Sequence, residues 1–478
     1  MASPRRLVRL ACFLATHTFA LRSPPRAAPL PTAPASRAAS LSKALGRKCL
    51  EVGLALASCA PSLPAAAAVS KAPVAATATT AAPVAATAAS RKYLLFTGFP
   101  FPLGPFTERR TVQSELVKGR VYGFEQEIRL SGISANVRST VFRTKDNHLV
   151  VYNPVAPTEE FLAQLDALGS EGVSHVLLGA TTYEHKVFVG PFARKFPGAK
   201  VWAVPDQWSF PVDLPSKLYG IDARGSGGGD LVDTAGGSAA YGAAPDLTSE
   251  FEVKLLRPSR RLGLGYAASE AAVYHKGTKT LALTDALVSV PARPTPSYDA
   301  ANLRTIGADA RSAGTLGTLV LKGTAAVNWQ GVGAKTVSDF FASPDRSPAD
   351  ELQRGWERNV LLSLFFGPSP ESLVHPDPAF QRLSERWIVA PVTDSLVYRS
   401  SRVKPELRRW VDDVAKWDIK YISPSHFAAK QGTSQDWKRA FQATLADGAG
   451  QPEKKPFCEQ DARLLEGIST QLVKLNVI

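Results

Sequence analysis

The chain has 478 residues, enough for two or three domains or for one large domain with processed segments. Its net charge of +14 is concentrated near the N-terminus, because residues 1–92 contain 12 of the 56 basic residues and only one of the 42 acidic residues. The remainder is nearly neutral, which argues against nucleic acid or an anionic membrane as a partner.

Cysteine usage excludes two kinds of small scaffold. The four cysteines are Cys12, Cys49, Cys59 and Cys458, and the first three lie in the basic N-terminal region. If processing removes that region, only Cys458 remains. An intrachain disulfide and a zinc ribbon are then both excluded.

Residues 1–90 have the composition of a targeting leader followed by a linker. The first twenty residues, MASPRRLVRLACFLATHTFA, combine basic residues with a short apolar run that ends in small residues, as a secretory signal does. The following LRSPPRAAPLPTAPASRAASLSKALGRK contains Ser, Ala, Pro and Arg but no acidic residue, which is typical of a plastid transit peptide. We therefore expect a plastid (chloroplast) location. A plain low-complexity leader with one cleavage is the alternative.

A second apolar run, CLEVGLALASCAPSLPAAAA, resembles a thylakoid-lumen signal that is cleaved after import. It contains Glu51 and two prolines, so we expect no transmembrane span in it. The stroma and the thylakoid lumen both remain open as destinations, and a lumenal location would imply a thylakoid-associated partner. The leader ends in a linker in which APVAATA occurs twice.

The first half of the body, from Arg91, alternates predicted strands and helices. Two β-rich runs around Asp146-Asn147 predict a hairpin. A helix is predicted after Thr158, its expected N-cap, with Gly169 as its stop. The apolar VSHVLLGA predicts a buried strand, HKVFVGPFARKFP a short helix cut by Pro191, and AKVWAVP another strand.

The second half continues this alternation after a Gly- and Ala-rich segment, residues 220–250, that we expect to be a low-complexity loop. SEAAVYHKGTKTLALTDALVSV predicts two strands joined at KGTK, and IKYISPSHF predicts a late strand. Helices are expected near 355–366 and 401–417. The pattern predicts one layered α/β domain over residues 91–445, followed by a C-terminal tail at 446–478.

Three of these strands end in ionisable side chains. LLGATTYEH brings Glu184 and His185, TLALTDA brings Asp285, and YISPSHF brings His426. Binding and catalytic groups commonly gather at strand ends on a sheet scaffold. Two carboxylates and two imidazoles form an N/O ligand set suited to one divalent metal such as Zn, Fe or Mn. The alternative is a hydrogen-bonded cluster without metal.

The order of these motifs resembles the metallo-β-lactamase fold, an αββα sandwich whose first metal motif, His-x-His-x-Asp-His, follows a strand. Laid on this chain, the motif falls on ATTYEH. Ala180 and Thr182 occupy the two early His positions, Glu184 the Asp position and His185 the final His. The resemblance implies that Asp285 matches the bridging Asp and His426 the last His. One metal site of the usual pair has therefore lost its imidazoles.

A closer resemblance covers residues 99–445. Long segments, among them EHKVFVGPFARKFPGAKVW, KTLALTDALVSVP and WDIKYISPSHF, are similar to a plant, algal and cyanobacterial family named domain of unknown function 4336. This resemblance implies a metallo-β-lactamase-like core and plastid residence. It implies no substrate.

Two functions follow from these patterns. The loss of the early histidines favours a non-catalytic plastid protein, or one of unassigned activity, that binds or assembles without chemistry. The retained quartet favours a hydrolase with one metal ion, acting on an ester, amide or phosphoester, in which Asp285 orients or deprotonates the attacking water.

Overall fold

The computed structural model describes residues 87–95, 103–130, 133–207, 215–233, 245–259, 261–262, 267–308, 348–446 and 456–474. The expected leader and linker therefore lie outside the described residues, apart from 87–90, which belong to a cap and a short 3-10 helix, η2 (Ala88–Arg91). Within the described ranges, no helix is both long and apolar enough to span a bilayer.

The first sheet has seven strands in chain order: β1 (Val112–Val117), β2 (Val121–Leu130), β3 (Ile133–Arg143), β4 (Leu149–Tyr152), β5 (Val173–Leu178), β6 (Lys200–Ala203) and β7 (Gly229–Asp230). Strands β1 to β4 form an antiparallel meander, whereas β4 to β7 are parallel. The predicted hairpin is confirmed as β3 and β4, with Asn147 at φ 66° in its turn.

The second sheet has five strands in the order β14-β13-β10-β9-β8. Their bounds are β8 (Phe251–Leu256), β9 (Glu270–His275), β10 (Thr280–Leu283), β13 (Tyr421–Pro424) and β14 (Lys430–Gln431). The predicted pair around KGTK is confirmed as the antiparallel strands β9 and β10. The late strand β13 lies parallel to β10 although it follows it by about 140 residues in the chain.

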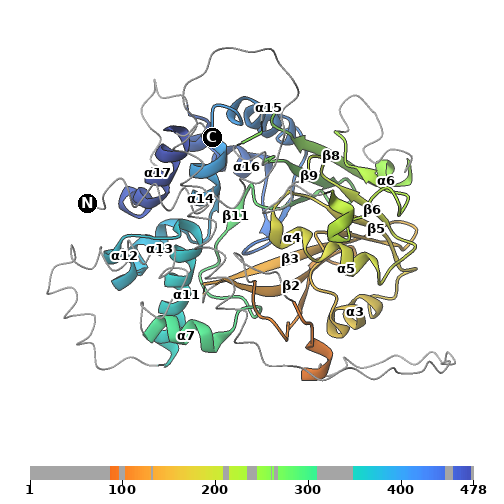
Figure 1. Ribbon diagram of the computed structural model, residues 1–478, viewed down its shortest axis with the longest axis horizontal. Helices are drawn as coiled ribbons and strands as arrows, with labels where there is room; N and C mark the ends of the chain where they lie inside the picture. Colours follow the sequence, from red (N-terminus) through yellow and green to blue (C-terminus); the bar gives the residue numbers. More distant parts are fainter. Residues whose placement is uncertain are drawn as a thin grey trace, which may run out of the picture. The chain divides into compact units, whose positions relative to one another are not determined.

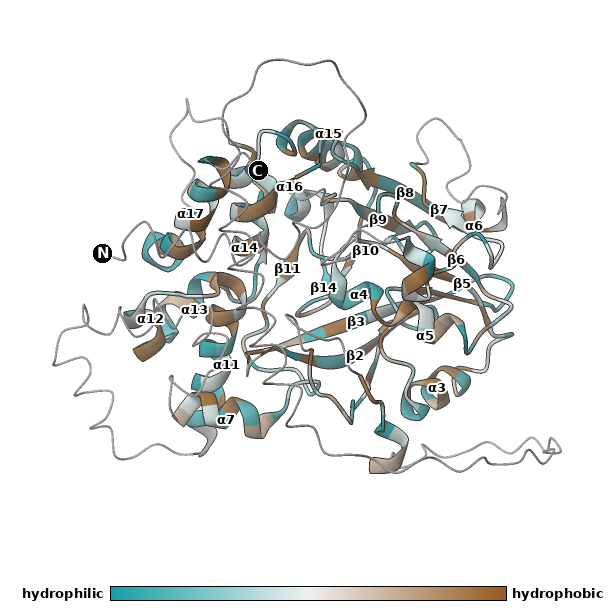
Figure 2. Cartoon of the chain, viewed as in Figure 1, coloured by the Kyte–Doolittle hydropathy of each residue, from teal (hydrophilic) through white to brown (hydrophobic). Residues whose placement is uncertain are grey.

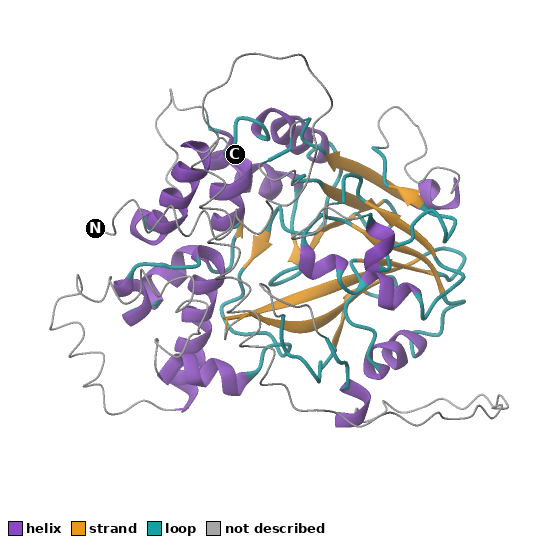
Figure 3. Ribbon diagram, in the orientation of Figure 1, coloured by secondary structure: helices purple, strands orange, loops and turns teal. Residues whose placement is uncertain are grey.

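The two sheets pack face to face with helices on their outer faces. Between the sheets, Phe142 of β3 and Trp202 of β6 share one apolar cluster with Val273 of β9 and Ala282 of β10. On the outer face of the first sheet, α3 (Glu159–Asp166) and α5 (Val189–Ala193) cover the strands; on the second, α15 (Lys404–Val414) and α16 (Ser434–Leu445) do so. This layer order is the predicted αββα sandwich, and Figure 3 shows the strands between helices.

A group of helices lies beside the sandwich, on the left in Figure 1. It comprises α7 (Ala300–Ala308), α11 (Pro348–Phe365), α12 (Pro370–Val374), α13 (Asp377–Leu383), α14 (Pro391–Thr393), the π-helix η8 (Asp394–Tyr398) and α17 (Glu459–Lys474), with the small pair β11 (Val288–Ser289) and β12 (Trp387–Ile388). Trp356, Phe380 and Leu465 belong to its apolar core. Figure 2 shows these helices with mixed apolar and polar faces.

Two predicted irregular segments contain regular structure. Within 220–250, β7 pairs with β6 and forms the edge of the first sheet, and α6 (Pro245–Glu250) precedes β8. The short 3-10 helix η3 (Ser216–Tyr219) lies just before this segment. Glycine is needed there because a Cβ at Gly228 would overlap the backbone of Val201. Within 446–478, α17 buries Leu465, so this part of the tail packs on the helical group.

The predicted helices also occur where the periodicity indicated. The Thr158 side chain accepts a hydrogen bond from the amide of Phe161 and caps α3. Pro191 does not end the helical segment as predicted. It lies in the first turn of α5, where a proline removes no intrahelical hydrogen bond.

Candidate metal centre

The pairing of β10 with β13 places Asp285 and His426 at the same edge of the second sheet. Leu283 lies opposite Pro424 in this parallel pair, and each side chain of the centre follows two residues later. Because the carboxyl ends of parallel strands meet at one edge, residues about 140 positions apart in the chain become neighbours.

The end of β5 crosses from the first sheet to the second and brings the other two residues. The amide of Ala271 in β9 donates to the carbonyl of Gly179 at 2.8 Å. A Cβ at Gly179 would overlap the phenol ring of Tyr152, so this crossing requires glycine. The chain then forms the single-turn helix α4 (Tyr183–Lys186), which carries Glu184 and His185.

These four residues, Glu184, His185, Asp285 and His426, are called here the candidate centre. One ligand atom from each lies within 4.8 Å of all the others. Nε2 of His426 is 3.2 Å from Nε2 of His185 and 3.2 Å from Oδ1 of Asp285. Nε2 of His185 is 3.6 Å from the same Oδ1, and Oε1 of Glu184 is 4.0 Å from Nε2 of His426.

This geometry fits one tetrahedral metal ion. Bonds of about 2.0–2.1 Å at tetrahedral angles separate two ligand atoms by about 3.3 Å. The three distances among His185, Asp285 and His426 lie close to that value, while Glu184 lies slightly farther away. Two imidazoles and carboxylate oxygens suit Zn, Fe or Mn, the metals that the residue types predicted. The structure thus brings the four residues that the sequence predicted as ligands to within 4.8 Å of one another.

Hydrogen bonds outside the centre fix the orientation of its side chains. Nδ1 of His426 lies 2.7 Å from the backbone carbonyl of Asn136, to which it donates, and this bond leaves Nε2 free to act as a ligand. Thr182 lies at the N-cap position of α4 but makes no cap bond with its side chain. Its hydroxyl instead donates to Oδ2 of Asp285 at 2.9 Å, so Oδ1 faces the two imidazoles.

The charges of the candidate centre are mutually stabilising. Burial by itself raises the pKa of Asp285, but hydrogen bonds and positive charge from His185 and His426 outweigh it and hold that pKa below its ordinary value. Burial lowers the pKa of His426, but the hydrogen bond and charge of Asp285 outweigh this effect and raise it. An internal ion pair between Asp285 and His426 is therefore the alternative to metal binding.

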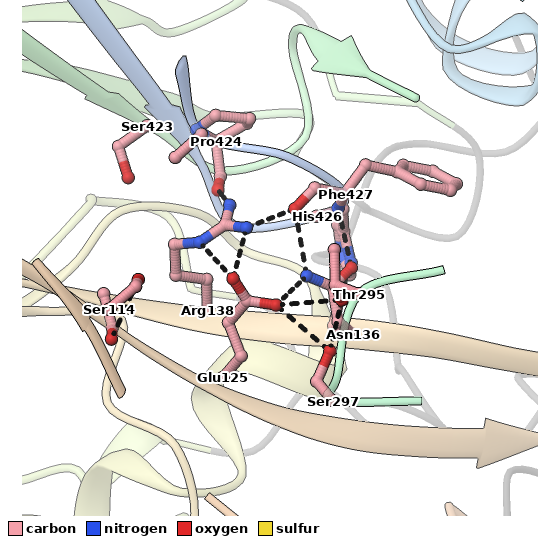
Figure 4. Close-up of polar contacts among 12 residues, drawn as sticks. Ser114, Glu125, Asn136, Arg138, Thr295, Ser297, Ser423, Pro424, His426 and Phe427 are labelled. Atoms are coloured by element: carbon pink, nitrogen blue, oxygen red, sulfur yellow. Dashed lines mark hydrogen bonds and ion pairs between the residues drawn. The ribbon is translucent and has the colours of Figure 1, made fainter. Parts of the chain in front are cut away.

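A buried ion pair clamps the loop that carries His426 (Figure 4). Arg138, only 1% exposed, donates to Oε1 of Glu125 at 3.1 and 2.7 Å. The same guanidinium donates to the carbonyls of Pro424 and Phe427, on either side of the histidine. Asn136 completes the clamp, since its side-chain carbonyl accepts from the amide of Phe427 at 2.7 Å.

Two further residues join the strand ends, and neither was singled out from the sequence. Asn153, at φ 49° directly after β4, accepts from the amide of Gly179 at 2.8 Å and donates to the hydroxyls of Thr284 and Ser425 at 2.9 and 3.0 Å. It thereby ties the ends of β5, β10 and β13 together. Its only sequence signal is an Asn-Pro pair that ends an apolar run, which is a common turn pattern.

The second of these residues, Glu270, holds the loop of Asp285. Its Oε1 accepts from the amides of Thr284, Asp285 and Ala286 at 2.8, 3.0 and 3.2 Å. Burial, and next the negative charge of Asp285, raise the pKa of Glu270 to about 8. Glu270 is the first residue of β9. The sequence shows only an acidic residue at the start of a strand, which does not indicate this contact with the loop of Asp285.

Ala180 and Thr182 contribute no carboxylate, imidazole or thiolate, so the candidate centre, as the described residues form it, has ligands for one ion. Ala180 is 2% exposed and lies in an isolated bridge with Glu270. His275 lies apart from the centre, against the rings of Phe142 and Phe251, and has a structural position.

A cavity of about 480 Å³ opens beside the candidate centre. Glu184, Asp285 and His426 are among its lining residues, together with side chains from β2, β3, α11, α14 and η8. The centre is therefore reachable by a small organic molecule and not only by water.

One family matches most of this chain. A sequence model described as "Domain of unknown function (DUF4336)" matches residues 118–378 and 375–443, which include the whole candidate centre. The curated proteins contain no match to this sequence.

Several solved structures are similar to this chain, at low sequence identity and with low TM-scores. The metal-soaked Flv1 flavodiiron core of Synechocystis sp. PCC6803 is 11% identical with a TM-score of 0.35, over 70% of this chain and 61% of that one. The metallo-beta-lactamase of Pontibacter korlensis is 11% identical with a TM-score of 0.31, over 71% of this chain and 100% of that one. A flavoprotein of Thermotoga maritima is 9% identical with a TM-score of 0.36, over 70% and 61%. Such distant likeness carries no argument about chemistry.

Proposed function

Because the chain belongs to the DUF4336 family, whose description assigns no activity, we propose from the geometry of the candidate centre that it is a hydrolase with one divalent metal ion. One observation carries the proposal. Two imidazole nitrogens and a carboxylate oxygen converge at 3.2–3.6 Å, the spacing of ligands on one ion, at the wall of a cavity.

The residues of the centre have separable roles in this proposal. A divalent metal would supply Lewis acidity, which polarises a scissile carbonyl and acidifies water. Both oxygens of Asp285 are engaged, one facing the imidazoles and the other bonded to Thr182, so this residue holds and orients. Of the two water-related roles that the sequence suggested for Asp285, the geometry favours orientation.

In this proposal His185, Asp285 and His426 hold the metal, and Glu184, the most distant of the four residues, takes the proton. Its side chain is 28% exposed, it lines the cavity, and its Oε1 is 4.0 Å from Nε2 of His426, farther than the other ligand atoms. In hydrolysis the water oxygen bonds to the carbonyl carbon and the bond to the leaving group breaks. Glu184 accepts the proton that the water loses and returns it to the leaving group.

Metal content tests the proposal directly. The full chain is purified without chelator from cells supplied with Zn, Fe and Mn, and its metals are measured by elemental analysis. We expect about one equivalent in the wild type and less than about a tenth in His185→Ala. His148→Ala, which removes a surface histidine paired with Asp146, is the matched control and is expected to retain the metal. A wild type without stoichiometric metal contradicts the proposal.

A non-catalytic binding or assembly protein is the second candidate, and the apolar Ala180 in an early His position favours it. It is distinguished by turnover. If the protein holds one equivalent of metal and hydrolyses no ester or amide, the centre is structural. Hydrolysis that disappears in Glu184→Gln, with metal retained, supports the catalytic function.

We also propose that the protein acts in the plastid, on the composition of residues 1–90. A fluorescent protein fused after residue 90 is expected to enter plastids. The same fusion without those residues is expected to stay outside. Equal distribution of the two fusions contradicts this location, and lumenal or stromal fluorescence distinguishes the two destinations.

A further inference from the structure

We propose that the cavity beside the candidate centre binds the apolar acyl chain of a neutral carboxylic ester, which is the substrate class of the hydrolase. The reaction rests on the proposed function, whereas the binding of an apolar group stands on the cavity itself. Hydrolysis would join a water oxygen to the acyl carbon, break the acyl carbon–oxygen bond, and leave a carboxylate, an alcohol and one released proton.

The walls of the cavity are apolar. Ile128 of β2 and Ile133 of β3 line it from the sandwich, and Leu364, Val392 and Val397 line it from α11, α14 and η8. Its volume of about 480 Å³ lies within the range of about 300–1,000 Å³ for pockets that hold small organic ligands.

The charges on the wall select against anions. Among the described residues that line the cavity, the ionisable ones are Glu184, Glu270, Asp285, His426 and Tyr183 with Tyr398, and neither lysine nor arginine is present. Sites that recognise a phosphate or a free carboxylate commonly use Arg or Lys as the partner of that group. The phosphoester alternative is therefore disfavoured, and a neutral ester is favoured.

Phe366 gives a second, independent indication of an apolar ligand. It follows α11 at φ 59°, a left-handed position that glycine usually occupies after a helix. It also remains 42% exposed and lines the cavity. A large apolar side chain is thus kept where the backbone favours glycine and where solvent reaches it, as expected for a residue that contacts a ligand.

The binding step is tested without catalysis, on the full chain freed of metal. The probe is N-phenyl-1-naphthylamine, which is neutral, and its matched control is 1-anilinonaphthalene-8-sulfonate, the same ring system with one anionic group. We expect saturable fluorescence of one equivalent of the neutral probe and at least tenfold weaker binding of the sulfonate. Equal or tighter binding of the sulfonate overturns the proposal.

Variants locate the probe in the cavity. Val392→Trp fills it and Phe366→Gly removes one wall while relieving the backbone, so each is expected to weaken binding at least tenfold. Val473→Trp and Phe106→Gly, which alter exposed apolar residues outside the lining, are the matched controls and are expected to bind as the wild type does. Binding that is unchanged in Val392→Trp and Phe366→Gly overturns the proposal.

The reaction is tested with 4-nitrophenyl esters on metal-loaded protein. We expect kcat/KM to rise roughly threefold to fourfold for each methylene from acetate to hexanoate, as for burial of an apolar chain. A rate that does not change with chain length, or preferential cleavage of bis(4-nitrophenyl) phosphate, overturns the substrate class. If the metal-loaded wild type cleaves none of the esters while the metal-free protein still binds the neutral probe, the hydrolase is refuted and the apolar site is supported.

Discussion

Replacing Arg138 by methionine tests how the fold holds His426 in the candidate centre. The guanidinium is 1% exposed and bonds Glu125 and the carbonyls of Pro424 and Phe427. Methionine has a similar volume and no charge. The substitution therefore leaves a buried carboxylate without its cation and two buried carbonyls without this donor.

The magnitude follows from these lost contacts. Removing one partner of a buried ion pair costs about 3–5 kcal/mol, because the other charge stays buried and uncompensated. The hydrogen bonds that Asn136 and Ser297 make to Oε2 of Glu125 remain, which places the expected loss near the lower end, at about 3 kcal/mol. The loop of His426 also loses its clamp, so we expect metal affinity to fall about 10- to 100-fold.

Urea unfolding followed by tryptophan fluorescence measures the loss of stability, and titration with Zn²⁺ measures the affinity. The double variant Glu125→Gln, Arg138→Met removes the uncompensated charge, so we expect it to be more stable than Arg138→Met alone. Arg409→Met is the control, since Arg409 is 74% exposed, pairs with Glu406 at 3.6 Å and should contribute at most about 1 kcal/mol. A loss below about 1 kcal/mol in Arg138→Met would refute the reasoning.

Three further outcomes are expected. Gly179→Ala should destabilise the protein by about 1–3 kcal/mol, because its Cβ would overlap Tyr152. Gly198→Ala is the control and should not destabilise it, because the space around that Cβ is open. Thermal melting followed by circular dichroism compares the two variants. Burial outweighs the carboxylate of Glu250 and lowers the pKa of His275, so the folded state binds fewer protons than the unfolded state below about pH 6.5. The free energy of unfolding should therefore fall as the pH decreases from 6.5, by up to about 1.4 kcal/mol per pH unit from this group. In His275→Gln the midpoint of urea unfolding should depend less on pH in this range. An unchanged pH dependence contradicts the lowered pKa of His275. Removing metal with a chelator should lower the melting temperature, since a ligand at 100 times its Kd stabilises by about 2.7 kcal/mol, and a melting temperature that chelation leaves unchanged contradicts a metal bound to the folded state.

Much of the fold was predictable because its signals are local. The hairpin around Asn147, the capped helix after Thr158 and the strand pair around KGTK each depend on residues close together in the chain, and each is confirmed. The strand β7 was not predicted, because its two residues pair only through their backbone with the edge of β6. Helix α17 was missed because its partners in the helical group are distant in sequence.

The sequence by itself determined which chemistry the strand ends could carry: two carboxylates and two imidazoles after three apolar strands, with alanine and threonine in the early histidine positions. Only the tertiary structure decided that Nε2 of His185 and Nε2 of His426 meet at 3.2 Å, that Asn153 and Arg138 hold the loops, and that an apolar cavity lies alongside. The physical reason is that side-chain type is a property of one position. A ligand distance instead depends on strand register and on the packing of two sheets, which join residues that are up to about 290 positions apart.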